Sequence, residues 1–245
     1  MDNKTILRTE EKYLISKTDQ TALLKALAPY LVHDEYYQEE VLSLYYDTPN
    51  FDLVIKSIDH PDFREKIRLR AYNVPKLSSK VFFEVKSKYA VGKKKLSNKR
   101  RLILPLADFY AYQSGEQTLE SVAAKASHDN SQQIQIAREL DYLVKLYAAE
   151  PKVLISSDRL AFKGKDDAGF RLTFDEHLRF RTSNLELDKG SQGENYFNQI
   201  IMEVKTMHAM PPWFIAELSR RHIYPATFSK YGKIYQLLTE RKQNV

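Results

Sequence analysis

Several stretches of this chain alternate between charged and apolar residues, and this alternation limits the possible folds more than any other feature. In residues 63–72, every second position is cationic at Lys66, Arg68 and Arg70, and the positions between them are apolar. Successive side chains of a β-strand point to opposite faces of its sheet. We therefore predict a strand with one cationic face and one apolar face.

The same alternation recurs in at least five further stretches. Their polar faces hold Arg8, Glu10 and Lys12; Glu84, Lys86 and Lys88; Lys99 and Arg101; Arg171, Thr173 and Asp175; Glu203 and Lys205. On any single strand such a face is most simply a solvated surface. The repetition, with mostly cationic faces, instead favours a sheet that collects positive charge.

Rows of like charge on neighbouring strands need a counter-charge, because they destabilise a sheet. Two cations about 4 Å apart repel by roughly 4 kcal/mol at an effective dielectric constant near 20. A bound polyanion would supply the negative charge, and arginine binds phosphate oxygens in a bidentate manner. If the sheet closes into a barrel of about eight strands, the interior has room for one small or thread-like ligand.

Acidic residues share these faces, at Glu10, Glu84 and Glu203. They can form ion pairs with the neighbouring cations. They can also hold Mg²⁺ or Mn²⁺, which usually bind through one or two carboxylates together with substrate phosphates. The sequence leaves both roles open.

The remaining pattern predicts one α+β domain over residues 1–245, with a mainly antiparallel sheet. Expected strands span 6–15, 40–47, 63–72, 80–89, 96–104, 153–162, 170–174, 178–181 and 199–206. Expected helices span 17–31 (with Thr18 as N-cap), 51–57, 212–221 and 229–241, and the region 105–149 is helical. Residues 188–195 are predicted to be a loop.

Composition excludes several classes of function. The chain has no cysteine, so thiolate zinc sites, iron–sulfur clusters and cysteine nucleophiles are ruled out, and a reducing, cytoplasmic location is expected. No apolar run approaches the length of a membrane span. A Gly-rich phosphate-binding loop of the GxxxxGK[ST] type is missing as well. The net charge of +6 is modest and by itself selects no partner.

The motifs, taken in order, resemble the VTC domain, the polyphosphate polymerase domain of the vacuolar transporter chaperone complex. This family belongs to the triphosphate tunnel metalloenzymes, also called the CYTH superfamily. The matching residues are Arg8-x-Glu10-x-Lys12, Lys66-x-Arg68-x-Arg70, Glu84-x-Lys86, Lys99-x-Arg101, Arg159, Arg171, Glu203-x-Lys205 and Phe228-Ser229-Lys230-Tyr231. The resemblance implies a closed antiparallel β-barrel tunnel with flanking helices. It also implies Mn²⁺- or Mg²⁺-dependent transfer of the γ-phosphoryl group of ATP to a growing polyphosphate chain.

The resemblance also implies roles for individual residues. Lys12, Arg68, Arg70, Lys86, Lys99, Arg159, Arg171, Ser229 and Lys230 would hold phosphates, and Glu203 would hold the metal, with Glu10 and Glu84 as further candidates. The other cations of the alternating faces are expected to contact substrate: Arg8, Lys66, Lys88, Arg101 and Lys205. Two positions depart from the family pattern. Arg8 replaces the first glutamate of the superfamily motif, and Ser157 stands where a tyrosine is frequent.

Two other functions stay open. The first is hydrolysis of inorganic triphosphate or nucleoside triphosphates on the same fold. The second is a non-catalytic module that binds polyanions or RNA, which is disfavoured because the charged faces carry few aromatic residues for base stacking. Expected partners are therefore ATP and polyphosphate or triphosphate, without nucleic acid and without membrane insertion. A stand-alone catalytic module is expected, and a membrane-protein partner and the oligomeric state stay open.

Overall fold

The computed structural model describes residues 9–59, 62–91, 94–126 and 131–243. These residues group into two compact units. Unit 1 holds Met1–Glu40, Ser157–Leu178 and Asn195–Phe228, and unit 2 holds Val41–Ser156, Arg179–Glu194 and Ser229–Val245. Four strands contribute residues to both units. The expectation of one domain over 1–245 stays a prediction.

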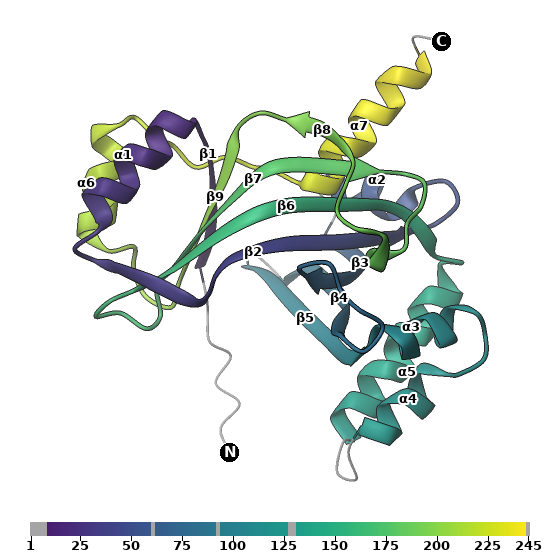
Figure 1. Ribbon diagram of the computed structural model, residues 1–245. Coiled ribbons are helices and arrows are strands. Elements are labelled where there is room, and N and C mark those ends of the chain that lie inside the picture. The colour runs from purple at the N-terminus through teal and green to yellow at the C-terminus, as the bar shows by residue number, and fades with distance from the viewer. Residues whose placement is uncertain (1–8, 60–61, 92–93, 127–130, 244–245) are drawn as a thin grey trace. The chain divides into compact units, whose positions relative to one another are not determined.

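Unit 2 is built on three consecutive antiparallel strands whose apolar face is covered by three helices (Figure 1). The strands are β3 (Phe63–Tyr72), β4 (Lys80–Val91) and β5 (Lys94–Pro105), and the helices are α3 (Leu106–Gln113), α4 (Leu119–Ala126) and α5 (Ser131–Leu146). Ile67, Phe83 and Leu102 from successive strands are buried in this core. The charged residues between them take the opposite face, which confirms the predicted division of the strands.

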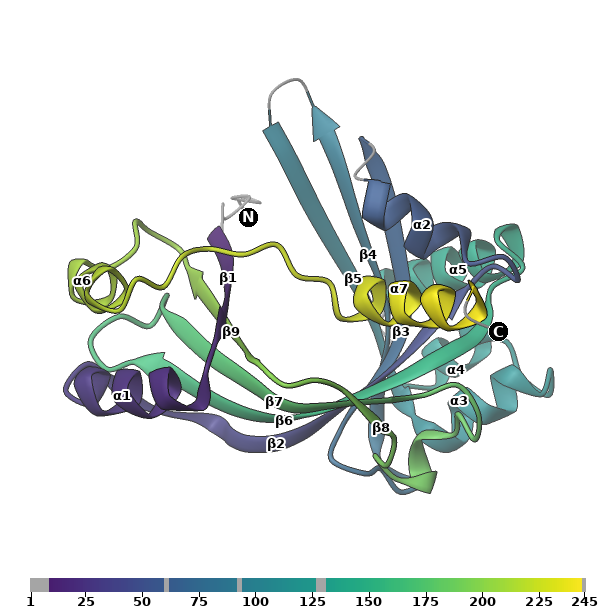
Figure 2. The same cartoon turned by 90° about the horizontal axis from the view of Figure 1, so that it is seen from above.

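Two more helices of unit 2 lie side by side, α2 (Asp52–Asp59) and α7 (Lys230–Gln243) (Figure 2). Asp47, at the end of β2 (Leu31–Asp47), fixes the start of α2. Its carboxylate accepts hydrogen bonds from the backbone N–H groups of Thr48, Leu53 and Val54. These bonds satisfy donors that the first turn of a helix leaves without intrahelical partners.

Unit 1 has a separate core on the apolar face of its own strands. These are β1 (Thr9–Ile15), β9 (Ile200–Thr206) and parts of β2, β6 (Glu150–Gly164) and β7 (Arg171–Arg181). Two helices that lie side by side, α1 (Lys17–Leu27) and α6 (Pro212–Arg220), supply Leu23 and Phe214 to this core (Figures 1 and 2). Phe174 and Met202 of neighbouring strands pack there and are fully buried. The remaining short elements are η1 (Leu187–Lys189) and β8 (Glu194–Phe197).

Several predicted boundaries are wrong for local reasons. The N-cap of α1 is Ser16, not Thr18, because Ser16 and Asp19 exchange hydrogen bonds with each other's backbone N–H groups. The helix ends at Leu27, before Pro29, and the chain re-enters a strand at residue 31. The sequence does not predict a strand over 31–39, because its apolar residues come in adjacent pairs, Leu31-Val32 and Tyr36-Tyr37, and do not alternate with the polar ones.

Other predicted elements were divided or joined differently. The region 105–149 is helical as predicted, and it consists of three helices, α3, α4 and α5. The two short strands predicted over 170–174 and 178–181 are one strand, β7. The loop predicted over 188–195 includes the end of η1 and the start of β8. Among the described residues, none of the helices has the length and apolar composition needed to span a bilayer.

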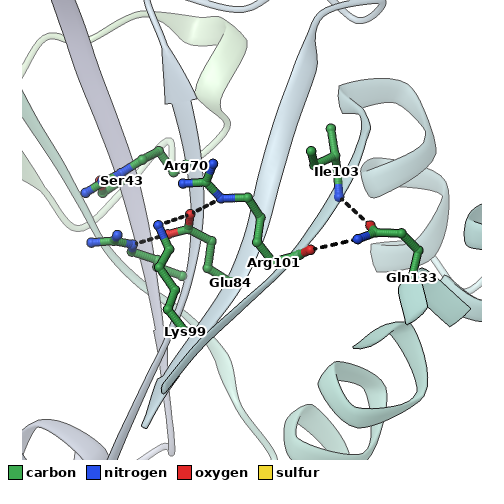
Figure 3. Close-up of polar contacts among 8 residues, drawn as sticks. Ser43, Arg70, Glu84, Lys99, Arg101, Ile103 and Gln133 are labelled. Carbon is green, nitrogen blue, oxygen red and sulfur yellow. Dashed lines mark hydrogen bonds and ion pairs between the residues drawn. The ribbon is translucent and has the colours of Figure 1, made fainter. Parts of the chain in front are cut away.

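The protein has an α+β fold. The strand pairs β1–β9, β2–β3, β3–β4, β4–β5 and β7–β9 are antiparallel, but the sheet is not a closed barrel. Its strands follow the order β1-β9-β7-β6-β2-β3-β4-β5, with β8 attached to β7, so β1 and β5 are the two outer strands in the described chain. At β5, two backbone groups bond to a side chain of α5. Gln133 of α5 donates to the carbonyl of Arg101 and accepts from the N–H of Ile103 (Figure 3). The closed tunnel implied by the resemblance is therefore wrong for this structure.

Candidate functional site

A row of three lysines crosses the charged face of unit 2. Lys66 of β3 is directly opposite Lys86 of β4, which is directly opposite Lys99 of β5. Like charges in this arrangement destabilise a sheet. An anionic ligand at this row would relieve the repulsion between the three ammonium groups.

Glu84 forms the centre of the next row, between Arg68 and Arg101. Among the described side chains of β3, β4 and β5 it is the one acid on this face, and it is 1% exposed. The Arg68 Nε atom lies 2.7 Å from Oε2. The Arg101 Nε and Lys99 Nζ atoms each lie 2.7 Å from Oε1 (Figure 3). Both carboxylate oxygens are thus occupied by cations. This geometry favours the ion-pair role of Glu84 over the metal-ligand role.

The protonation of this cluster follows from burial and from the pairing. Burial raises the pKa of Glu84, but Arg68, Arg70 and Lys99 outweigh it and lower the pKa to about 2. Burial lowers the pKa of Lys99 to about 8, although Glu84 counteracts it. At neutral pH the cluster therefore holds a carboxylate among cations, with Lys99 closest to losing its proton.

Tyr45 is a member of this cluster that the sequence did not reveal. It lies on β2 directly opposite Arg68, which donates a hydrogen bond to its hydroxyl, and its ring stacks on Tyr231 of α7 with centroids 4.7 Å apart. Burial raises the pKa of Tyr45, but Arg68, Arg70 and Lys66 outweigh it and lower the pKa to about 8. Alternation within 40–47 could place Tyr45 on a face, but only the order of the strands places it against Arg68.

The start of α7 meets the same cations. The Ser229 hydroxyl accepts hydrogen bonds from Lys66 Nζ at 2.9 Å and from the Gly232 N–H at 3.1 Å, so Ser229 is the N-cap of α7. Lys230 follows as the first residue of the helix. The terminal motif and the Lys66 strand, which are far apart in sequence, are therefore brought together by this hydrogen bond.

The second concentration of charge lies in unit 1, around Glu203. Lys12 of β1 is directly opposite Glu203 of β9, and Lys205 forms an ion pair with the same carboxylate. The Lys12 ammonium also donates to the carbonyl of Phe228 at 3.2 Å. Burial raises the pKa of Glu203, but Lys205, Lys12 and Arg159 outweigh it and lower the pKa, so the carboxylate is ionised.

Two arginines on the strands of unit 1, Arg159 and Arg171, each pair with a different acid. Arg159 binds Asp175 through two hydrogen bonds of 2.6 and 2.8 Å, and both side chains are largely buried. Arg171 forms an ion pair with Asp34 at 2.8 Å. Sequence reasoning missed Asp34, because it lies in the polar part of β2 that showed no alternation.

The remaining predicted residues lie around these two clusters. Lys88 is exposed and lies in a row with Arg64, beyond the three lysines. Arg70 donates a hydrogen bond to the Ser43 hydroxyl at 3.2 Å. Glu10 is exposed and directly opposite Lys205. Arg8 lies outside the described residues.

The oxygen donors of unit 1 fit a hard divalent cation better than those of unit 2. Nowhere in the described parts of the chain do three acidic or histidine side chains converge to form a complete metal site. Glu203 is an ionised carboxylate, and Lys12 of β1 lies directly opposite it. Glu10 lies two residues before Lys12, on the same face of β1. One or two carboxylates are what Mg²⁺ or Mn²⁺ usually takes from a protein when phosphates supply the other ligands.

Comparison with known families agrees with this arrangement of residues. The model of the VTC domain matches residues 7–239. The chain belongs to the VTC domain family. The match includes both charge clusters, from Lys12 in β1 to Ser229 before α7.

Two relatives of this VTC domain are subunits 4 of vacuolar transporter chaperone complexes. The protein from Trypanosoma brucei brucei is 27% identical over 217 residues, covering 78% of this chain and 27% of the relative. The protein from Schizosaccharomyces pombe is 28% identical over 193 residues, covering 71% of this chain and 26% of the relative. The chain thus spans about a quarter of the length of these relatives.

A solved structure of a candidate adenylate cyclase from Vibrio parahaemolyticus also resembles this VTC domain. It covers 93% of this chain and 97% of its own, at 12% sequence identity and a TM-score of 0.46. This likeness is too low to support an argument about fold or function.

Proposed function

We propose that this VTC domain is a polyphosphate polymerase that transfers the γ-phosphoryl group of ATP to the end of a polyphosphate chain. The observation that carries the proposal is the row of Lys66, Lys86 and Lys99, three cations that the strands hold directly opposite one another. Such a row costs folding stability and is explained if a chain of phosphates binds across it. Membership of the VTC domain family supports the same function.

The transfer needs no nucleophile from the protein. A terminal oxygen of the acceptor chain attacks the γ-phosphorus, the bond from that phosphorus to the β–γ bridging oxygen breaks, and ADP leaves with the electron pair. The chain grows by one phosphate. The protein contributes position and charge stabilisation, which are the main catalytic terms in phosphoryl transfer.

Each cluster has a role that suits its charges. In unit 2, Arg68, Lys86 and Lys99 bind phosphate oxygens, and Glu84 holds the arginine and lysine side chains in place. In unit 1, Lys12, Arg159 and Arg171 bind phosphates, and Glu203, assisted by Glu10, holds Mn²⁺ or Mg²⁺. When bound, the divalent ion neutralises negative charge on the phosphate oxygens.

The proposal extends to location and partners. We place the domain in the cytoplasm, where ATP is available, and beside a membrane protein that receives the product. The relatives' names as subunits of a chaperone complex support a partner protein.

The decisive experiment is incubation with ATP and Mn²⁺ or Mg²⁺, followed by separation of the products by length on a gel. A ladder of phosphate chains is the expected result. Orthophosphate alone would replace the polymerase with a triphosphate hydrolase, and no turnover would indicate a binding module.

A pair of neighbouring residues in β5 provides a matched control for that assay. Lys99 lies on the charged face, whereas Arg100 lies on the other face and pairs with Glu139 of α5. We expect Lys99→Ala to lower turnover about 10²–10³-fold, as for the removal of one transition-state donor. Arg100→Ala should stay close to the wild type. Equal losses in both variants would assign the effect to the fold of β5 instead of to phosphate binding.

A further inference from the structure

Thr173 carries a buried hydroxyl group that lacks a hydrogen-bond partner in the described chain. The residue is 4% exposed, and its Oγ1 atom is fully shielded from solvent. It lies in β7 directly opposite Glu203, and on its own strand it stands between Arg171 and Asp175 on the same face. The group thus belongs to the charged face of unit 1, opposite the apolar core.

Leaving this hydroxyl unsatisfied is unfavourable for the free protein. A buried polar group without a partner destabilises a fold, and native proteins contain few such groups. Valine has nearly the same shape, favours strands and would fill the position without that cost. A threonine at this position is therefore explained by a ligand that completes its hydrogen bond.

Thr206, in the neighbouring strand β9, shows what a structural threonine looks like in this unit. It is 1% exposed, and its hydroxyl bonds to both the carbonyl and the N–H of His208 at 3.2 Å. Both threonines are buried in strands, and they differ in whether the protein satisfies the hydroxyl. This difference points to a binding role for Thr173.

The surroundings indicate the class of ligand. Arg171 is on the same face of the same strand, and Lys12 lies one strand beyond Glu203. Hydroxyl donors together with arginine and lysine are the groups that commonly bind phosphate oxygens. Glu203 is paired with Lys205 and Arg171 with Asp34, so this face is close to charge balance and suits a phosphate that arrives with a divalent cation.

We propose that Thr173 is a substrate-binding residue whose hydroxyl donates a hydrogen bond to a phosphoryl oxygen of a bound phosphate chain. This inference rests on the proposed function for its ligand, a polyphosphate or nucleoside triphosphate. It adds a neutral donor to the cations Lys12 and Arg171. A donor of this kind fixes the orientation of a phosphate that cations alone would hold only by charge.

The test measures the binding of tripolyphosphate by calorimetry, in EDTA and again with Mg²⁺. Thr173→Val removes the hydroxyl and keeps the shape. With Mg²⁺ we expect the affinity to fall about 10- to 100-fold, as for a hydrogen bond to a charged group, and in EDTA, where unit 2 provides most of the binding, by less than about 3-fold. Thr173→Ser should restore most of the affinity. Thr206→Val should keep the wild-type affinity and lower the melting temperature, whereas Thr173→Val should leave the melting temperature unchanged or raise it.

Other results would overturn the proposal. An unchanged affinity in Thr173→Val with Mg²⁺, or no binding of tripolyphosphate to the wild type, would show that the hydroxyl does not bind a phosphate chain. A weaker affinity of Thr173→Val for Mg²⁺ alone, titrated without tripolyphosphate, would show that the hydroxyl binds the cation instead of the phosphate. A melting temperature as low as that of Thr206→Val would show that the hydroxyl has a structural role. Because the assay requires no chain synthesis, a failed polymerase reaction with an intact Thr173 effect would reject only the proposed function.

Discussion

In the strands of unit 2 three cations share one buried carboxylate, whereas in the strands of unit 1 three cations each pair with a different acid. Arg68, Lys99 and Arg101 all contact Glu84. In unit 1, by contrast, Lys205 pairs with Glu203, Arg159 with Asp175, and Arg171 with Asp34. The same alternating strands have thus produced one face with excess positive charge and one face close to balance.

This difference in charge predicts different ligands for the two faces, a bare anion for unit 2 and a phosphate with its divalent cation for unit 1. An excess of cations attracts an anion without help and is relieved when the anion binds. A balanced face gains little from a bare anion, because each arginine already has a carboxylate, but it can accept a phosphate that arrives with a divalent cation. We therefore expect unit 2 to bind phosphate chains in the absence of metal, and unit 1 to respond to metal.

The largest expected effect is on stability, from removing the shared acid. Glu84→Gln leaves three cations without their carboxylate, and losing one partner of a buried ion pair destabilises a protein by about 3–5 kcal/mol. Glu203→Gln should cost less, roughly 1.5–3 kcal/mol, because Arg159 and Arg171 keep their own acids. Denaturant unfolding of both variants measures the difference.

Tripolyphosphate supplies the control for that comparison. It should restore more stability to Glu84→Gln than to Glu203→Gln, because the ligand replaces the missing negative charge of unit 2. Equal losses in the two variants, with equal rescue, would contradict the distinction between a shared acid and matched acids.

Binding without metal should show the next largest effect. We expect Lys86→Ala to weaken tripolyphosphate binding in EDTA about 10-fold, because one charge of the lysine row is lost. Arg159→Ala should change metal-free affinity by less than about 3-fold, since Arg159 is already bound to Asp175. Calorimetry in EDTA checks both values. A stronger loss in Arg159→Ala than in Lys86→Ala would reverse the assignment of the two faces.

A dependence on pH follows from Lys99 in unit 2. Because burial lowers its pKa to about 8, the free protein loses this cation as the pH rises through 8, and tripolyphosphate affinity should fall. The unfolded chain still binds that proton up to its ordinary pKa of 10.5, so the Lys99 contribution to the stability of the free protein should rise between pH 8 and 10.5.

The charged groups that face Lys99 are Glu84, Arg68 and Arg101. Two variants distinguish the titration of Lys99 from that of Tyr45. Tyr45 also has a pKa lowered to about 8, and its ionisation would likewise disfavour an anion. Lys99→Arg should move the loss of affinity to higher pH, while Tyr45→Phe should make it less steep. A profile that is flat from pH 7 to 9 in the wild type would contradict both assignments.

The smallest effect should come from the edge of β5. Gln133→Leu removes the amide that bonds to the backbone of Arg101 and Ile103, two long hydrogen bonds of 3.3 and 3.4 Å. We expect a loss of about 1 kcal/mol in unfolding free energy. Tripolyphosphate affinity should stay within about 2-fold, because Arg101 remains paired with Glu84. A larger loss of affinity would show that α5 positions the charged face of unit 2.

The sequence predicted the faces of the strands well, because alternation is a local property of extended backbone. Ile67, Phe83 and Leu102 are in the core, and Lys66 and Arg68 are on the opposite face, as the pattern of each strand required. Prediction failed where that pattern was weak, as in residues 31–39. It also failed at α1, where Ser16 and Asp19 cap the helix in place of Thr18.

What the sequence by itself determined is therefore which residues share a face and that the faces carry mainly cations. Only the tertiary structure decided which residues of different strands lie together. Glu84 lies against three cations, Tyr45 lies opposite Arg68, and Thr173 lies opposite Glu203. The physical reason is that alternation depends on neighbours two residues apart. Strand order, register and the open edge at β5 depend instead on contacts between residues far apart in the chain, which no local pattern encodes.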